Sequence, residues 1–197
     1  MILPNQLTVL RIILTPFVIY FLLSDIIYFK EIGLIIYLIA ALTDWYDGWL
    51  ARKFDYITTW GKVWDPIADK VLTSATFITL ALLGILAWWA VALIALRDIL
   101  ITGLRSYAEH KKKSFPTSKY AKIKTLVQMV FLYFVLISYV LSQSTFLSSG
   151  ARDFFYMLFH NVWCDTAFYT VTVITVHSGY TYIKDNFQII KELLSRQ

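Results

Sequence analysis

The chain has 197 residues, of which 58% are hydrophobic and 16% are charged, and its mean hydropathy is +0.62. This composition indicates an integral membrane protein with a single domain, residues 1–197, rather than a soluble protein. The formal net charge is +5 at pH 7. In so apolar a chain, the excess of Lys and Arg indicates membrane orientation and phosphate binding rather than nucleic-acid binding. The only cysteine, Cys164, excludes a disulfide within the chain.

Six apolar stretches are each long enough to cross a bilayer as a helix, which takes roughly 20 residues. They are residues 7–23, 32–51, 67–86, 88–107, 120–142 and 163–183. We therefore expect an all-α fold, an integral membrane bundle of six transmembrane helices. The first stretch is too long for a cleavable signal peptide, and no small-residue cleavage site follows it. Between the last two stretches, the polar and aromatic segment 142–165 predicts an external loop with an interfacial helix near residues 154–162.

The basic residues predict the orientation of this bundle. Those near one set of helix ends are Arg11, Arg52, Lys53, Lys62, Lys70, Arg105, Lys111, Lys112, Lys113, Lys119, Lys122, Lys124, Lys184, Lys191 and Arg196. The opposite ends carry only Lys30 and Arg152, and Arg97 lies within the fourth stretch. Because the cytoplasmic ends of transmembrane helices are enriched in Lys and Arg, we expect both termini and the turn after the second helix to face the cytoplasm.

The most distinctive stretch runs from Asp44 to Asp69 and reads D-W-Y-D-G-W-L-A-R, then eight residues, then G-K-V-W-D-P-I-A-D. Positions spaced i, i+3, i+4 and i+7 share one face of the second helix; they are Asp44, Asp47, Gly48 and Ala51. Positions at four-residue steps share one face of the third helix; they are Gly61, Asp65 and Asp69. If these faces meet, the four carboxylates converge. Carboxylates that converge in apolar surroundings repel one another, and a divalent cation would stabilise them.

Two other interpretations of this stretch remain open at this point. Aspartates at helical spacing often form a solvated face, but the flanking residues here are apolar and long enough to span a bilayer. Acidic residues within membranes also mark ion pathways, so a cation-transport site is a stronger alternative. Gly48, Ala51 and Gly61 have little or no side chain, so two backbones or a bulky ligand could approach there. Arg52 follows on the second helix and is suited to hold a phosphate.

The pattern D-x2-D-G-x2-A-R-x8-G-x3-D-x3-D is complete in this chain, from Asp44 to Asp69. It resembles the signature of the CDP-alcohol phosphatidyltransferases. The resemblance implies a homodimeric membrane enzyme of phospholipid synthesis, in the bacterial inner membrane with its active site facing the cytoplasm. It also implies the reaction, which moves a phosphatidyl group from CDP-diacylglycerol to an alcohol and releases CMP. For an all-carboxylate site we expect Mg²⁺ or Mn²⁺ as the cofactor, with two ions.

The same resemblance implies roles for individual residues. The expected metal ligands are Asp44, Asp47, Asp65 and Asp69, and Asp69 is also the candidate general base for the acceptor hydroxyl. The N-terminal N-x-L-T-x-x-R stretch resembles the glycerophosphate-using branch, in which this helix face lies near the nucleotide. Asn5 could instead simply cap the first helix. The residues expected to bind the CDP-lipid are Asn5, Thr8, Asp47, Gly48, Ala51, Arg52 and Gly61.

A basic cluster is expected to bind the acceptor. The sequences R-D-I-L-I-T-G-L-R and A-K-I-K-T resemble the phosphatidylglycerophosphate synthases, whose acceptor is glycerol 3-phosphate, although Ala121 and Asp98 stand where Gly and Glu are common. The residues expected to bind the acceptor's phosphate are Arg97, Arg105, Lys122 and Lys124. Adjacent residues on a helix point apart, so we expect no salt bridge between Arg97 and Asp98. For the same reason of spacing, the two lysines diverge unless the start of their helix is frayed.

Other acceptors and one other class of protein remain alternatives. A cardiolipin synthase of the same superfamily would use phosphatidylglycerol, whose phosphodiester the basic cluster does not exclude, and an inositol phosphate is a less favoured acceptor. A divalent-cation transporter would explain the four carboxylates. It would not explain the residues that stand in register with them, which are Gly48, Ala51, Arg52 and Gly61. In the sixth helix, His177, Ser178 and Tyr182 could line the site, although packing is the default interpretation.

Overall fold

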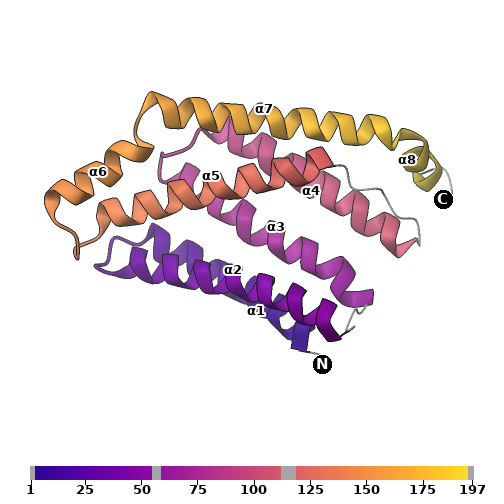
Figure 1. The fold of residues 1–197 in the computed structure, drawn as a ribbon, viewed down its shortest axis with the longest axis horizontal. Helices are drawn as coiled ribbons and strands as arrows, with labels where there is room; N and C mark the ends of the chain where they lie inside the picture. The colour runs from indigo at the N-terminus through magenta and orange to yellow at the C-terminus, as the bar shows by residue number, and fades with distance from the viewer. Residues whose placement is uncertain (1–2, 55–58, 112–118, 195–197) are drawn as a thin grey trace.

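The structure is a computed structural model that describes residues 3–54, 59–111 and 119–194. In these ranges the chain forms eight helices and no strand (Figure 1). The helices are α1 (Leu3–Leu23), α2 (Phe29–Phe54), α3 (Thr59–Leu82), α4 (Trp88–His110), α5 (Lys119–Gln143), α6 (Ser149–Phe159), α7 (Val162–Asp185) and α8 (Phe187–Leu194). The all-α prediction is therefore confirmed.

Six of these helices are long, with 21 to 26 residues each. At about 1.5 Å per residue, each spans roughly 30 Å or more, which is the thickness of the hydrocarbon core of a bilayer. Among the described residues, two segments are also apolar enough to cross a membrane, Gln6–Leu23 and Tyr120–Gln143. Large apolar side chains are exposed along the long helices, for example Ile13, Leu42 and Val173. This combination of length and exposed apolar surface indicates a membrane protein.

The long helices form one bundle in which α5 contacts both halves of the chain (Figure 1). In the first half, α1 packs against α2 and α3, and α3 packs against α4. In the second half, α7 packs against α4 and α5, and α5 also contacts α2 and α3. Leu132 and Leu136 of α5 are fully buried in a core that also contains Phe77, Ile94 and Phe168. This core holds α3, α4, α5 and α7 together, and these helices carry most of the charged residues described below.

The third helix is predicted at residues 67–86, but α3 begins at Thr59 and ends at Leu82. Gly84 follows with φ +73°, a left-handed conformation that glycine adopts without steric strain and that commonly ends helices. The N–H groups of Gly84 and Ile85 donate to the carbonyl oxygens of Ala81 and Leu80, at 3.0 Å each. These bonds satisfy the last carbonyl groups of the helix, so it stops before its predicted end.

The interfacial helix is predicted near residues 154–162 but lies earlier in the chain, as α6. The Ser148 hydroxyl accepts a hydrogen bond from the N–H of Ala151 and caps the start of α6. The helix ends at Phe159, because Asn161 begins the next one. The Asn161 side chain accepts a hydrogen bond from the N–H of Cys164 at 2.9 Å and caps α7. Two capping side chains therefore set these boundaries, which the apolar pattern alone does not reveal.

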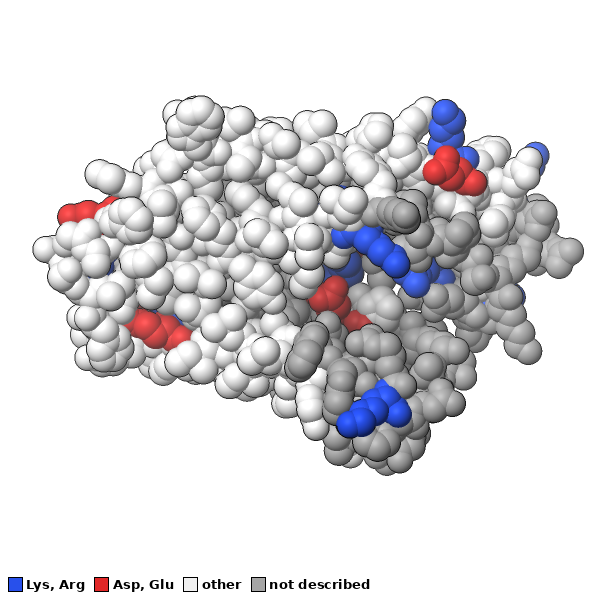
Figure 2. Space-filling model, viewed as in Figure 1, with Lys and Arg blue, Asp and Glu red and all other residues white. Residues whose placement is uncertain are grey.

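One end of the bundle gathers the features on which a site depends. In Figure 1, the start of α1, the end of α2, the start of α3, the end of α4 and the start of α5 lie in the right-hand half of the view. The short helix α8, which the sequence analysis does not predict, lies there too and packs Ile189 and Ile190 against Ile101 and Tyr182. On the face shown in Figure 2, Lys and Arg side chains gather mainly toward the same end. The charge asymmetry along the chain is therefore also an asymmetry of the folded molecule.

Candidate active site

The aspartate motif lies on two consecutive helices. Residues 44–52 are helical in α2 and residues 61–69 are helical in α3, which confirms the predicted placement of the motif. The side chains of several predicted site residues lie outside the described part of the structure; they are Asn5, Asp44, Asp47, Gly48, Ala51, Arg52 and Gly61. The geometry of the site is therefore built from the α3 half of the motif and from the helices packed around it.

Asp65 is connected to α1. The hydroxyl of Thr8, which is fully buried in α1, donates a hydrogen bond to Asp65 Oδ1. The bond forms because α1 and α3 pack against each other, although Thr8 and Asp65 are far apart in the sequence. Thr8 is predicted to bind the CDP-lipid; in this structure its hydroxyl contacts a motif carboxylate. A hydrogen bond of this kind fixes the orientation of a carboxylate that must bind a metal.

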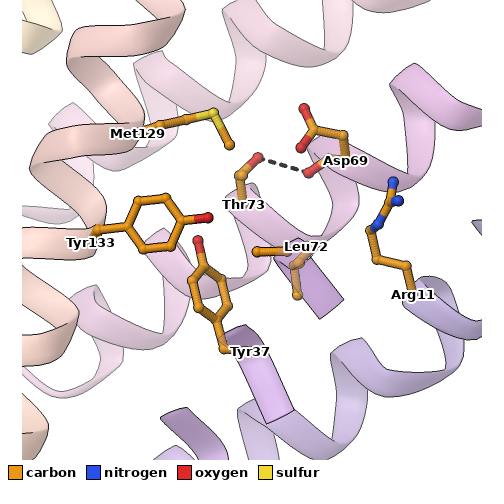
Figure 3. Close-up of a pocket in the computed structure, with 8 residues that line it drawn as sticks. Arg11, Tyr37, Asp69, Leu72, Thr73, Met129 and Tyr133 are labelled. Atoms are coloured by element: carbon orange, nitrogen blue, oxygen red, sulfur yellow. Dashed lines mark hydrogen bonds between the residues drawn. The ribbon is translucent and has the colours of Figure 1, made fainter. Parts of the chain in front are cut away.

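Asp69 lies one turn further along α3, at a small cavity that Arg11, Tyr37 and Tyr133 also line (Figure 3). The cavity has a volume of about 20 Å³, which is enough for one water molecule. The hydroxyl groups of the two tyrosines point toward each other in it. The Thr73 hydroxyl donates to the main-chain carbonyl of Asp69 at 3.0 Å. The Asp69 side chain remains 25% exposed, so a ligand can reach its carboxylate.

The oxygen donors on this part of α3 are compatible with a metal site. Asp65 and Asp69 are one helical turn apart, so both carboxylates project from the same face. Among the described side chains, no group of three or more His, Cys, Asp or Glu residues converges, and the predicted ligands Asp44 and Asp47 lie outside that set. Carboxylate oxygens suit a hard cation such as Mg²⁺. The described residues therefore fit the expected cofactor, which stays a prediction.

A second charged cluster surrounds Asp98 of α4, whose side chain is 1% exposed. Lys124 Nζ lies 2.5 Å and Arg97 Nη1 lies 3.0 Å from Asp98 Oδ1. Lys70 Nζ lies 3.3 Å and Gln128 Nε2 lies 3.1 Å from Asp98 Oδ2. Donors from α3, α4 and α5 thus stabilise one buried carboxylate, which would be very costly without them. We call Lys70, Arg97, Asp98 and Lys124 the Asp98 cluster.

Arg97 forms the salt bridge with Asp98 that the sequence analysis does not expect. That prediction is wrong because adjacent positions diverge at their first side-chain atoms, whereas the long arginine side chain turns back toward its neighbour. Arg97 Nη2 also donates to Ser178 Oγ of α7 at 2.8 Å. A Cβ atom at Gly179 would lie only 2.9 Å from Arg97 Cγ. Ser178 and Gly179 thus fix the path of the arginine, and Ser178 does more than pack.

The predicted acceptor residues separate into two groups. Arg97 and Lys124 meet in the Asp98 cluster, as the previous distances show. Arg105 and Lys122 are exposed. Lys122 lies about 200° around the helix axis from Lys124, so the predicted divergence of the two lysines is confirmed. The structure therefore brings two of the four residues together and leaves the other two on the surface.

Two residues that contact Asp98 have no role in the site that the sequence analysis predicts; they are Lys70 and Gln128. Lys70 follows the last motif aspartate directly, and its Nζ lies 3.9 Å from Asp69 Oδ2 as well as 3.3 Å from Asp98 Oδ2. Gln128 is a polar residue one turn after Lys124, in a helix that is otherwise mostly apolar. A buried polar residue in an apolar helix is costly unless it has a hydrogen-bonding partner. The presence of Gln128 in such a helix could therefore have indicated a buried polar partner. The partner that Lys70 and Gln128 share, Asp98, lies on another helix and is not visible from spacing.

Comparison with known proteins shows which family has this arrangement. A family model described as CDP-alcohol phosphatidyltransferase matches residues 1–163. The chain belongs to the CDP-alcohol phosphatidyltransferase family. The matched range contains the whole aspartate motif and the Asp98 cluster, and it confirms the resemblance inferred from the motif.

Similar members of this CDP-alcohol phosphatidyltransferase family come from bacteria. A protein from Rickettsia typhi is 30% identical over 182 residues, which cover 92% of this chain and 95% of the relative. One from Bacillus subtilis is 29% identical over 201 residues, covering 96% and 97%. One from Salmonella choleraesuis is 37% identical over 139 residues, covering 68% and 75%. All three are named CDP-diacylglycerol–glycerol-3-phosphate 3-phosphatidyltransferase.

The two clusters of this family member adjoin each other at Lys70. On one side, Asp65 and Asp69 offer oxygen ligands and a carboxylate that can accept a proton. On the other side, the Asp98 cluster offers ammonium and guanidinium groups for an anion. Because Lys70 contacts both Asp69 and Asp98, the two groups of charged side chains lie next to each other.

Proposed function

We propose that this chain transfers the phosphatidyl group of CDP-diacylglycerol to glycerol 3-phosphate, giving phosphatidylglycerophosphate and CMP. Relatives that align with more than nine-tenths of the chain are named for this transfer. The observation on the chain itself that carries the proposal is the position of Lys70, between Asp69 and Asp98. Glycerol 3-phosphate is a small acceptor with a hydroxyl at one end and a phosphate at the other, which suits two adjoining sites.

The reaction replaces one phosphorus–oxygen bond by another. The hydroxyl oxygen of glycerol 3-phosphate attacks the phosphorus that bears the diacylglycerol. The bond from this phosphorus to the phosphate oxygen of CMP breaks, and CMP leaves with the electron pair. Asp69 acts as the general base and accepts the proton of the attacking hydroxyl. Its partly exposed carboxylate supports this role.

Two divalent cations, Mg²⁺ or Mn²⁺, complete the proposed site. Their ligands would be Asp44, Asp47, Asp65 and Asp69, with Thr8 holding Asp65 in place through its hydrogen bond. When bound, the ions offset the charge of the diphosphate and stabilise the departing CMP. The motif aspartates are therefore proposed both to hold the ions and, at Asp69, to remove the proton.

The two substrates have separate sets of binding residues in this proposal. The residues that bind the CDP-lipid are Asn5, Thr8, Asp47, Gly48, Ala51, Arg52 and Gly61. The residues that bind the phosphate of the acceptor are Arg97, Arg105, Lys122 and Lys124. Arg105 and Lys122 are exposed, so they would attract the charged acceptor from water. Arg97 and Lys124 lie deeper, in the Asp98 cluster.

The six long helices support a proposal for the membrane topology. We propose that α1, α2, α3, α4, α5 and α7 cross the inner membrane of a bacterium, with both termini and the active site on the cytoplasmic side. The gathering of Lys and Arg toward one end of the bundle supports this orientation (Figure 2), and the similar proteins are bacterial. We also propose that the enzyme is a homodimer, as the resemblance to the family implies.

The test is an acceptor competition with the full chain purified in detergent. CDP-diacylglycerol and Mg²⁺ are supplied with labelled glycerol 3-phosphate, phosphatidylglycerol or inositol 1-phosphate, and the labelled lipid and CMP are measured. We expect label from glycerol 3-phosphate to enter lipid in a reaction that a chelator stops. Incorporation only with a rival acceptor would overturn the assignment of the acceptor. If no acceptor releases CMP, the proposed transfer is wrong, and a cation transporter becomes the better explanation.

A further inference from the structure

The Asp98 cluster contains more positive charge than its carboxylate needs. A buried carboxylate is stabilised by one cation and by hydrogen bonds, and Gln128 supplies one such bond. Here Lys70, Arg97 and Lys124 all contact the carboxylate. They come from α3, α4 and α5, so no single helix places them together. With three cations around Asp98, and among the described side chains only Asp69 as a second nearby carboxylate, the cluster keeps a net positive charge.

The excess charge lies where an anion can reach it. The side chains of Lys70 and Arg97 are 15% and 12% exposed, whereas those of Lys124 and Asp98 are each 1% exposed. Lys124 and Asp98 therefore form the buried floor of the cluster, and Lys70 and Arg97 form its accessible side. Lys70 also contacts Asp69, so the accessible side faces the carboxylate proposed to act as the base.

We propose that Asp98 is the positioning residue of the acceptor site, which holds Lys70, Arg97 and Lys124 together beside Asp69 so that they receive a phosphate monoester. This inference rests on the proposed function and adds to it the residue that builds the acceptor site. Without the carboxylate, three cations at these distances would repel one another and separate. With it, Lys70 and Arg97 are each held at one oxygen of the same carboxylate.

The charge of the cluster also favours one class of acceptor. A phosphate monoester carries a charge of about −1.5 to −2 at pH 7, so the positive cluster attracts it strongly. A phosphodiester, as in phosphatidylglycerol, has a single negative charge and is attracted less strongly. Arg97 adds a planar donor group that matches phosphate oxygens. The cluster therefore selects glycerol 3-phosphate over a phospholipid acceptor.

Removing the charge of Asp98 separates two explanations, because they predict opposite results. If the carboxylate only competes with the substrate for the cations, Asp98→Asn frees them and lowers the KM for glycerol 3-phosphate. If the carboxylate positions the cations, Asp98→Asn lets them separate and raises that KM. A charge-assisted hydrogen bond to the phosphate would then be lost or weakened, which corresponds to about a tenfold change or more.

The experiment measures kcat and KM for both substrates in the purified full chain. For Asp98→Asn we expect the KM for glycerol 3-phosphate to rise about tenfold or more, with the KM for CDP-diacylglycerol unchanged. Asp98→Glu keeps the charge but moves it by one methylene group, so its KM should lie between those of the wild type and Asp98→Asn. Asp153→Asn, which removes an exposed charge on α6, is the matched control and should behave as the wild type.

A second pair of variants tests the placement of Arg97 without changing a charge. Gly179→Ala puts a methyl group 2.9 Å from Arg97 Cγ, so it should displace the guanidinium and raise the KM for glycerol 3-phosphate. Gly103→Ala is the control, because nothing lies within 4 Å of a Cβ at that position of α4. Thermal unfolding of each variant shows whether the change in KM accompanies a loss of structure.

The outcomes distinguish this inference from the proposed function. If the wild type does not use glycerol 3-phosphate, the proposed function fails and the inference fails with it. If the wild type uses it, but Asp98→Asn lowers its KM or changes only kcat, the positioning role alone is wrong. If Asp98→Asn does not fold, the KM for glycerol 3-phosphate of Asp98→Glu and Gly179→Ala tests the positioning role instead. An unchanged KM for glycerol 3-phosphate in both would overturn the inference.

Discussion

At the scale of single residues, Asp69 and Lys70 show how consecutive positions serve two sites. Neighbouring residues on a helix diverge by about 100°, so Asp69 faces the small cavity beside α1 while Lys70 reaches Asp98 on α4. The ammonium group of Lys70 still lies 3.9 Å from Asp69 Oδ2. Asp69 is the proposed catalytic carboxylate, and Lys70 is part of the proposed acceptor site. The two sites are adjacent because these two residues are consecutive.

The first prediction concerns Asp69 as the general base. Asp69→Asn removes the group that accepts the proton of the acceptor hydroxyl, and general base catalysis contributes about 10²–10⁴-fold. We therefore expect kcat for phosphatidyl transfer to fall by about 100-fold or more, in an assay of CMP release. Asp153→Asn, with its exposed carboxylate on α6, should keep wild-type turnover. Normal turnover of Asp69→Asn would show that another group takes the proton.

The second prediction concerns the hydrogen bond between Thr8 and Asp65. Thr8→Val keeps the shape of the side chain but removes the donor that orients the carboxylate. Loss of such a supporting bond typically costs 10–100-fold in metal affinity, so Mg²⁺ should bind about 10–100-fold more weakly. Calorimetric titration of Mg²⁺ and the Mg²⁺ dependence of turnover would measure this, with Thr8→Ser as the variant that keeps the hydroxyl. Equal Mg²⁺ affinity in Thr8→Val would separate Thr8 from the metal site.

At the scale of elements, α3 connects the two clusters and α7 supports one of them. α3 presents Asp65 and Asp69 on one face and Lys70 on the neighbouring face. The orientation of α3 about its own axis therefore determines the positions of all three side chains. α7 contributes no charge to the Asp98 cluster, but Ser178 and Gly179 fix the arginine that does. The long helices thus act as rigid supports, and their ends are defined by local features such as Gly84 and Asn161.

The third prediction concerns the end of α3. Gly84 has φ +73°, and nothing lies within 4 Å of a Cβ at this position. Gly84→Ala therefore creates no clash and only forces alanine into the left-handed region, which costs about 1–2 kcal/mol. We expect thermal unfolding in detergent at a lower temperature, with kcat unchanged below the transition. Gly150→Ala, at a position equally open but without a positive φ, should not be destabilised in this way.

At the scale of the whole molecule, the distribution of charge gives the bundle two unlike ends. Lys and Arg side chains gather toward the end where α1 and α3 begin and α4 ends (Figures 1 and 2). A site at this end would meet the headgroup of a membrane lipid and a small water-soluble acceptor together. This placement would suit the proposed enzyme, which joins a lipid to a water-soluble phosphate.

The fourth prediction tests the orientation with single cysteines in a Cys164→Ser background. Lys111→Cys and Lys191→Cys, both at exposed positions, should react with a membrane-impermeant maleimide in inside-out vesicles but not in intact cells. Thr145→Cys, between α5 and α6, should show the opposite pattern. Labelling of Lys111→Cys and Thr145→Cys from the same side would contradict the crossing of α5, and exchanged patterns would invert the proposed topology.

Much of the fold can be predicted from the sequence because membrane helices are dictated by composition. A long apolar stretch has to satisfy its backbone hydrogen bonds internally, so it becomes a helix whatever surrounds it. The positions of α1, α2, α4, α5 and α7 therefore agree with the apolar stretches. The end of α3 and the bounds of α6 do not, because single residues such as Gly84, Ser148 and Asn161 decide them. Those residues act through backbone geometry and capping, which hydropathy does not register.

The sequence by itself determined the family and the α3 face with Asp65 and Asp69, because the motif is contiguous and its spacing matches the helical repeat. Only the tertiary structure decided how Arg97 and Lys124 are used, and that Lys70 and Gln128 join them. All four contact Asp98 across three helices. Spacing along one helix fixes which side chains share a face, but not what the opposing helix places against them. A buried carboxylate attracts whichever cations the packing brings within reach, so its partners become visible only when the helices are assembled.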